Sequence, residues 1–140
     1  MNQENQILSP ELEARVHQAV ENFMQGYGCC QSVVAAFADL YGLDETMAKR
    51  IGAGFGGGVG RMRMMCGAVS GIVVVQDLLA KSKQQNGSII CAEILGLKGY
   101  EKAQSSYVAS ARTAEYYKSR PCAAKVESAA RIFAEYLMEK

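Results

Sequence analysis

Apolar residues recur at every third or fourth position over much of this chain, which is the spacing of one face of an α-helix. The first such stretch opens with Ser9-Pro10-Glu11, which combines a hydroxyl cap, a proline at the first helical position and an acidic first turn. Its apolar face comprises Leu12, Val16, Ala19, Val20 and Phe23. Gly26 and Gly28 mark the expected end of this helix.

The same pattern predicts helices along most of the remaining chain. We expect them over about residues 29–41, 44–51, 66–83, 88–95, 100–117 and from 119 to near the C-terminus, with caps at Asp44, Ser88 and Ser119. The helix expected over 44–51 carries Met47 and Ile51. Expected inward positions of the second and last helices are Val33, Val34, Phe37, Leu40, Val126, Ala130, Phe133 and Leu137.

The run from Ile72 to Val75 is β-branched and would also suit a strand. Because no partner strand is evident elsewhere in the sequence, we interpret the run as buried helix. The predicted fold class is therefore all-α: a compact bundle of about six to seven helices with one glycine-rich loop. We expect residues 1–140 to form a single helical domain.

Composition adds few constraints on partners. The net charge of the 140 residues is +1, so no global field favours nucleic acid or an anionic membrane. The N-terminus lacks the basic and apolar regions of a signal peptide, and no apolar run approaches the roughly 20 residues of a membrane span. We expect a cytoplasmic protein without nucleic-acid binding or membrane insertion.

The five cysteines are the residues most suggestive of chemistry. In a reducing cytoplasm, cysteines more often serve metals or redox reactions than static cross-links, and an odd number argues against a simple disulfide framework. Four of them fall in the first turn of a predicted helix: Cys29, Cys66, Cys91 and Cys122. Helix N-termini lower cysteine pKa values, although a free cysteine also often simply packs in a core.

The spacing of these residues excludes several familiar sites. There is no C-x-x-C, so neither a thioredoxin-type site nor a zinc ribbon is expected. Cys30 points elsewhere than Cys29, and we expect it to pack in the core. His17 has no metal-ligand spacing around it and is predicted to lie on the surface of the first helix.

Residues 52–60 form a glycine-rich loop with a formal G-x-G-x-x-G pattern. A helix rather than a strand precedes it, so a dinucleotide site is not expected. Two structural roles remain, close backbone packing and positive-φ turns. Its amides, with Arg61 and Arg63, could instead face an anion or the Cys66 sulfur. The methionines that follow are expected to be core filler rather than Cu(I) ligands: Met62, Met64 and Met65.

Four segments of the chain resemble the C_GCAxxG_C_C family of redox-active proteins. The residues that carry the resemblance are Gly28–Val33, Cys66–Gly71 with the glycine loop before it, Gly87–Gly96, and Pro121-Cys122 followed by Val126–Ala130. Here cysteine precedes glycine in the central motif, and Cys30 stands where alanine is common. The resemblance implies that Cys29, Cys66, Cys91 and Cys122 are the family's four cysteines and that Cys30 is extra.

Three functions remain open. The first is thiol–disulfide exchange or electron transfer through the four cysteines, with a protein or small thiol as redox partner, and it would make the protein a thiol-dependent oxidoreductase. The second is a four-cysteine zinc or iron–sulfur site, for which Gly67, Ala68 and Gly71 are the candidate cofactor-facing residues. The third is a helical interaction module, with a transporter as the partner that the resemblance implies. The glycine-rich face is compatible with a homodimer.

Overall fold

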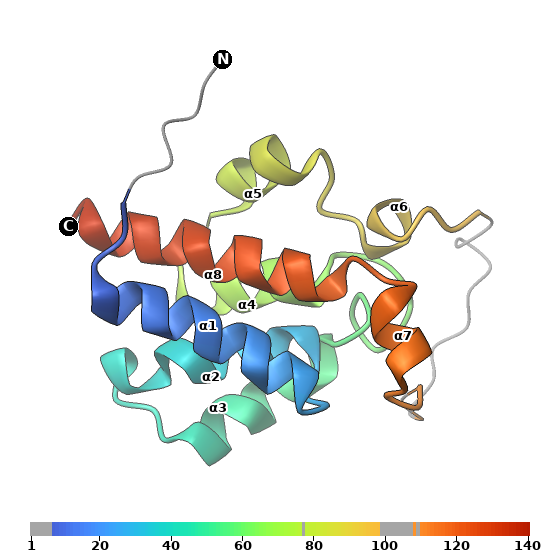
Figure 1. Ribbon diagram of the computed structural model, residues 1–140, viewed down its shortest axis with the longest axis horizontal. Helices are drawn as coiled ribbons and strands as arrows, with labels where there is room; N and C mark the ends of the chain where they lie inside the picture. Colours follow the sequence, from blue (N-terminus) through green and yellow to red (C-terminus); the bar gives the residue numbers. More distant parts are fainter. Residues whose placement is uncertain (1–6, 77, 99–107, 109) are drawn as a thin grey trace.

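The computed structural model describes residues 7–76, 78–98, 108 and 110–140, and over these it is a compact all-α structure (Figure 1). Its α-helices are α1 (Pro10–Met24), α2 (Cys29–Phe37), α3 (Glu45–Gly52), α4 (Gly67–Val75), α5 (Leu79–Asn86), α6 (Cys91–Ile94), α7 (Ala114–Lys118) and α8 (Cys122–Met138). Two 3-10 turns, η1 (Ala38–Tyr41) and η2 (Ala53–Phe55), follow α2 and α3. The predicted fold class is confirmed.

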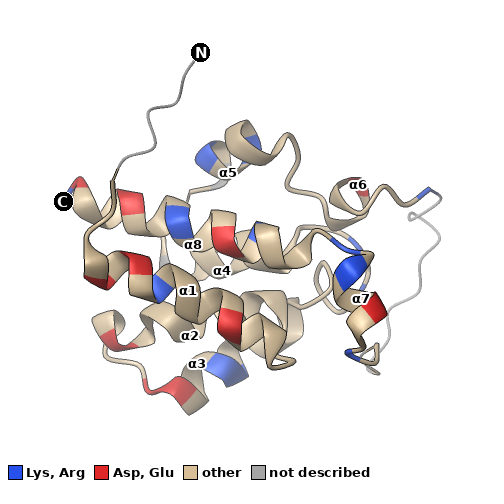
Figure 2. Ribbon diagram, in the orientation of Figure 1, with Lys and Arg blue, Asp and Glu red and all other residues tan. Residues whose placement is uncertain are grey.

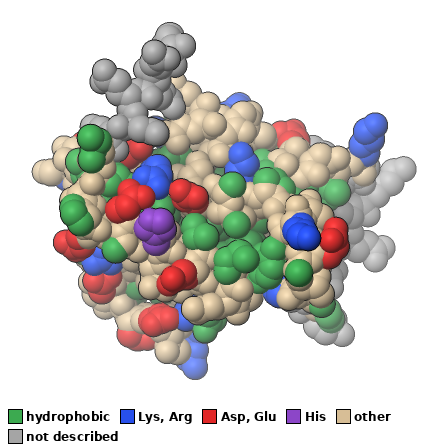
Figure 3. All heavy atoms as spheres, in the orientation of Figure 1, with side chains coloured by type: hydrophobic (Ala, Val, Ile, Leu, Met, Phe, Trp, Pro, Cys, Tyr) green, Lys and Arg blue, Asp and Glu red, His purple; other side chains and the backbone are tan. Residues whose placement is uncertain are grey.

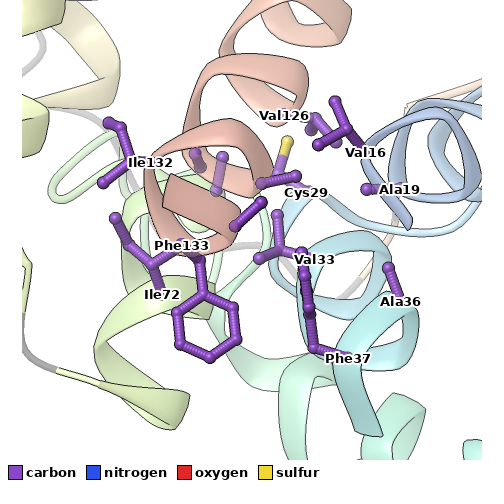
Figure 4. Packing of buried hydrophobic residues seen from close by; sticks show 14 of the residues in the cluster. Val16, Ala19, Cys29, Val33, Ala36, Phe37, Ile72, Val126, Ile132 and Phe133 are labelled. Atoms are coloured by element: carbon purple, nitrogen blue, oxygen red, sulfur yellow. The ribbon is translucent and has the colours of Figure 1, made fainter. Parts of the chain in front are cut away.

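The core lies where α8 packs against α1, α2 and α4. Phe37 of α2 and Phe133 of α8 meet edge to face, with ring centroids 4.7 Å apart, and both are fully buried (Figure 4). Burial of each such ring is worth about 1.5–3 kcal/mol, and an aromatic pair adds to this. Cys29 lies in the same core, between Val33 and Val126, so one thiol is built into the centre of the bundle (Figure 4).

Small residues let α4 approach α2 very closely. A Cβ on Gly71 would lie 2.8 Å from the Val33 Cβ, and a Cβ on Gly67 would lie 3.0 Å from the Cys29 Cβ. Both distances are shorter than ordinary carbon–carbon contacts. The approach brings the start of α4 beside the start of α2, and with it Cys66 beside Cys29.

Two predicted caps are confirmed. Ser9 Oγ accepts a hydrogen bond from the Leu12 N–H, and Asp44 Oδ1 accepts one from the Met47 N–H. Most of the predicted inward residues are buried, but Leu40 is 45% exposed because the chain tightens into η1 before reaching it. Leu137 is half-buried at the edge of the core. Met47 and Ile51 on α3 are exposed.

The single helix predicted over 66–83 is wrong, because the structure divides it. The run from Ile72 to Val75 is helical as predicted, but Gln76 is extended, with a φ of −164°, and α5 starts only at Leu79. The break turns the chain so that α5 packs on α8 instead of continuing past it (Figure 1).

Three other helix starts differ from prediction. Ser88 Oγ accepts from the Ile90 N–H in a local turn, and α6 begins at Cys91. The helix predicted over 100–117 begins only at Ala114, where Thr113 caps α7 by accepting a hydrogen bond from the Tyr116 N–H, and residues 110–113 are not helical. Of the earlier part of that prediction, only residue 108 lies within the described residues. The last helix begins at Cys122 rather than after Ser119. No helix of the described part is long and apolar enough to cross a membrane.

We predict that Gly71→Ala lowers the free energy of unfolding by about 1–3 kcal/mol, because the new methyl group overlaps Val33 in a packed interface. Gly54→Ala is the matched control, since no atom lies within 4 Å of a Cβ at that position and its φ is ordinary. We expect it to be neutral or to stabilise by up to about 1 kcal/mol. Urea denaturation measures both; equal effects would contradict the close α2–α4 contact.

Candidate functional site

The glycine-rich loop turns through an unusual left-handed segment. Gly57, Gly58, Val59, Gly60 and Arg61 have consecutive positive φ angles of 63°, 77°, 58°, 56° and 64°. For a non-glycine residue this conformation costs roughly 1–2 kcal/mol, so Val59 and Arg61 are strained. Backbone hydrogen bonds from the Gly60 N–H to the Gly54 oxygen and from the Met64 N–H to the Gly58 oxygen hold the turn. The predicted role of the glycines in positive-φ turns is confirmed.

An isolated antiparallel bridge joins the end of this loop to the start of α6. The Cys66 N–H donates to the Ile89 oxygen at 2.7 Å, and the Cys91 N–H donates to the Met64 oxygen at 2.5 Å. A Cβ on Gly58 would lie 2.7 Å from the Cys91 Cβ, so only glycine lets the loop pass over that cysteine. Cys66 and Cys91 therefore sit on adjoining, hydrogen-bonded segments.

All four predicted cysteines line one cavity of about 120 Å³, well above the 10–15 Å³ that a single water needs. Cys29, Cys91 and Cys122 are the first residues of α2, α6 and α8, and Cys66 is the N-cap of α4. The placement of all four at helix starts is confirmed. Cys122 is half-buried and the other three are buried.

A side-chain hydrogen bond joins the thiols of Cys29 and Cys122. This hydrogen bond, with Arg120, Arg112 and Arg63 nearby, lowers the Cys122 pKa to about 7 although burial opposes the change. The same hydrogen bond and burial raise the Cys29 pKa well above its ordinary value. The shared proton thus resides on Cys29 and the negative charge on Cys122.

Burial dominates at the other two cavity cysteines. It raises the Cys91 pKa to about 11, with Cys66 adding to the effect and Arg63 opposing it. Burial also raises the Cys66 pKa, against hydrogen bonds from the Ala68 and Val69 N–H groups. The expectation that a helix start lowers the cysteine pKa is therefore wrong for three of the four. At Cys29 the hydrogen bond to Cys122 and burial raise the pKa, and at Cys66 and Cys91 the loss of hydration outweighs the partial charge of the helix.

The cavity wall is strongly cationic. None of its described lining residues is acidic, and five are basic: Arg61, Arg63, Arg112, Arg120 and Lys125. In Figure 2 blue segments lie on and beside α7, near the start of α8; Glu115 on α7 is exposed and does not line the cavity. The sequence analysis named Arg61 and Arg63 but missed the other three. Arg120 and Lys125 could have been suspected because they lie close to Cys122 in the sequence, whereas Arg112 carries no such signal.

Two of these cations, Arg112 and Arg120, lie over the ring of Tyr116. The guanidinium carbons of Arg112 and Arg120 each lie 4.7 Å from the centroid of its ring, and Arg112 is also 4.8 Å from the Phe23 ring centroid. Arg112 Nη2 donates to the Tyr27 oxygen at 3.2 Å. Stacking on aromatic faces holds a guanidinium in place without consuming its hydrogen bonds, so these two arginines are fixed donors.

Comparison with known proteins supports the redox interpretation. Residues 27–85 match the family described as "Putative redox-active protein (C_GCAxxG_C_C)". Over these residues the predicted resemblance to the family is confirmed. The matched segment includes Cys29, Cys30 and Cys66, whereas Cys91 and Cys122 lie beyond it. Searches of curated proteins and of solved structures gave no match.

Cys30 packs in the core and His17 lies on the surface of α1, as predicted, and neither residue lines the cavity. Cys30, within the C_GCAxxG_C_C segment, is fully buried with Val34, Ala38 and Ala48, and burial raises its pKa to about 12. His17 is exposed on α1, where Figure 3 shows the chain's one histidine in purple at the surface beside acidic residues.

The three residues predicted to face a cofactor, Gly67, Ala68 and Gly71, lie in two different surroundings. Gly67 lines the cavity, whereas Ala68 and Gly71 are not among its lining residues and pack in the interior. Of the three methionines, Met65 packs against the core, but Met62 and Met64 are 38% and 51% exposed. The prediction that all three fill the core is wrong for those two, because the strained loop carries them outward.

The four cysteines do not form a ready set of metal ligands. Within residues 7–76, 78–98, 108 and 110–140, no three cysteine, histidine or carboxylate side chains are grouped so that they could hold a metal ion. The cavity also surrounds its thiols with five basic residues rather than with further ligands.

We predict that Cys122 is alkylated by iodoacetamide with a pH midpoint of about 7, since the thiolate forms as the pH rises through its lowered pKa. Arg120→Gln removes a nearby cation and should move this midpoint upward, toward the ordinary value of 9.0. Lys118→Gln is the control, because Lys118 is exposed and does not line the cavity. Peptide mapping of the labelled protein identifies the site; a Cys122 midpoint near 9 would contradict the assignment.

Proposed function

We propose that this protein is a thiol-dependent oxidoreductase that cycles Cys29 and Cys122 between a dithiol and a disulfide. One observation carries the proposal: the two thiols are hydrogen-bonded neighbours in a cavity, with the charge on the more accessible of the two. A reactive thiolate beside a protonated resolving thiol is what disulfide exchange requires. The family description of redox activity supports the same conclusion.

In the first step the Cys122 thiolate attacks one sulfur of a substrate disulfide. A bond forms between Cys122 and that sulfur, while the substrate's own sulfur–sulfur bond breaks. The electron pair of the broken bond stays on the second substrate sulfur, which leaves as a thiolate and takes up a proton. The pKa of about 7 keeps much of Cys122 ionised at neutral pH while leaving it nucleophilic.

In the second step Cys29 resolves the mixed disulfide. Its pKa is raised first by its hydrogen bond to Cys122 and then by burial, and the Cys122 charge disappears once the mixed disulfide forms. Cys29 can then lose its proton and attack the Cys122 sulfur. The Cys29–Cys122 bond forms, the mixed disulfide breaks, and the first substrate sulfur leaves as a thiolate. The protein is oxidised by two electrons and the substrate is reduced to two thiols.

Cys66 and Cys91 form the second pair in this proposal. The backbone bridge between their segments supports it, and the charge of Cys66 adds to the burial that raises the pKa of Cys91. A Cys66 thiolate that attacks the Cys29 sulfur releases the Cys122 thiolate, and Cys91 then displaces Cys29. This exchange moves the disulfide to Cys66–Cys91 and returns Cys29 and Cys122 to the dithiol.

A zinc or iron–sulfur site in the cavity is the alternative, favoured only by the convergence of four cysteines on one cavity. We propose a cytoplasmic, single-domain protein whose redox partner is a protein or a small thiol. A transporter partner and a homodimer are further proposals, the first from the family resemblance and the second from the glycine-rich face.

We predict that excess small disulfide removes free thiols in pairs, beginning with Cys29 and Cys122. Cys122→Ser should abolish the fast phase of the reaction, because the low-pKa nucleophile is gone. Cys29→Ser should stop at the mixed disulfide on Cys122, because no resolving thiol remains. Thiol titration and mass spectrometry of the quenched protein measure both outcomes.

Cys30→Ala is the control for these variants, because Cys30 is buried in a separate cluster and should leave the reaction unchanged. If Cys122→Ser reacts at the rate of the unmodified protein, Cys122 is not the nucleophile and the proposal fails. Purified protein that retains four-thiolate zinc or iron, with all four cavity cysteines protected from alkylation, would instead favour the metal site.

A further inference from the structure

We propose that the cavity selects small-molecule disulfides that carry a carboxylate or another anionic group close to the sulfur that Cys122 attacks. This inference rests on the proposed thiol–disulfide function and names the substrate class of the same site. It depends on the charge of the cavity wall, on one buried donor and on the depth of the cysteines.

The charge of the cavity is local rather than global. Five basic residues line it and none of its described lining residues is acidic, although the whole chain carries a net charge of only +1. None of the ion pairs among the described residues includes Arg63, Arg112, Arg120 or Lys125. Like charges gathered around a partly enclosed space repel one another, and an anion bound there relieves that repulsion.

Arg112 supplies a donor that is already in position. Its Nη1 is buried and has no hydrogen-bond partner in the described part of the chain, while its Nη2 bonds the Tyr27 oxygen. A buried donor left unpaired is unfavourable, because it has lost its hydrogen bonds to water without replacement. Because the guanidinium already lies against the Phe23 and Tyr116 rings, a carboxylate arriving at Nη1 gains a charge-assisted hydrogen bond without reordering the side chain.

Arg120 extends the same anion site toward the nucleophile. It shares the Tyr116 ring with Arg112, and both arginines lower the pKa of Cys122. A substrate whose carboxylate meets these guanidinium groups therefore presents its nearby sulfur to Cys122. The thiolate that leaves when the substrate disulfide breaks is also stabilised by the surrounding cations.

The depth of the cysteines favours a small molecule over a protein disulfide. Cys29, Cys66 and Cys91 are 8%, 6% and 7% exposed, and only Cys122 is half-buried. The resolving attack by Cys29 requires the mixed disulfide to lie inside the cavity. A low-molecular-weight disulfide can enter there, whereas one held on the surface of a folded protein cannot follow Cys122 inward.

The test compares three disulfides of similar size and different charge: dithiodipropionate, bis(hydroxyethyl) disulfide and cystamine, which are anionic, neutral and cationic. The rate constant for thiol loss at neutral pH and low salt should be highest for the anion and lowest for the cation, with at least about a tenfold difference between those two. Added salt should reduce this difference.

Arg112→Gln should lower the ratio of the anionic to the neutral rate by at least about fivefold, since it removes one charge-assisted contact. The ratio is the decisive readout, because a change in Cys122 reactivity alone alters both rates equally. Arg112→Lys should restore part of the ratio. Lys118→Gln, outside the cavity, should leave it unchanged.

Equal rates for the three disulfides would overturn the substrate assignment while leaving the thiol chemistry intact. Loss of the reaction with all three would overturn the proposed function instead. Calorimetry of Cys122→Ser with dithiodipropionate then tests the anion site separately. If the double variant, Cys122→Ser with Arg112→Gln, binds dithiodipropionate more weakly than Cys122→Ser alone, the result supports the anion site. Equal binding by the two variants overturns it.

Discussion

The contact between α2 and α4 allows no Cβ at Gly67 or Gly71, and the arrangement of the site depends on it. If the two helices stood apart at an ordinary separation, Cys66 would move away from Cys29 and the start of α4 would leave the cavity. A second close approach lies in the left-handed loop before α4, where Gly58 passes over Cys91 and the chain then reaches the bridge with Ile90. Packing of small residues thus assembles the thiols.

Two opposing electrostatic effects divide the assembled cysteines. Burial raises the pKa of Cys66 and Cys91, and the hydrogen bond to Cys122 together with burial raises that of Cys29, although each of the three begins or caps a helix. Cys122 is more accessible, accepts the Cys29 hydrogen bond and faces Arg120 and Arg112, so its pKa falls. In the proposed exchange, a single thiolate among protonated neighbours would separate the nucleophile from the resolving groups, which four equivalent thiols would not do.

The cationic wall connects this chemistry to recognition. The same arginines that stabilise the Cys122 thiolate form the anion site proposed for the substrate, so reactivity and selectivity arise from one set of charges. Stacking on Tyr116 keeps Arg112 and Arg120 at the cavity, and part of the folding energy of the bundle is used to hold like charges together.

The sequence by itself determined the helical class, the Ser9 and Asp44 caps, most core positions and the placement of four cysteines at helix starts, because these follow from short-range periodicity and local hydrogen bonding. Only the tertiary structure decided that α4 and α5 are separate helices, that Leu40 faces solvent and that Arg112 and Lys125 join Cys29 at one cavity. Burial and distance between remote segments have no signature in local spacing. For that reason the sequence identified the cysteines, whereas the fold distinguished Cys122 from the other three.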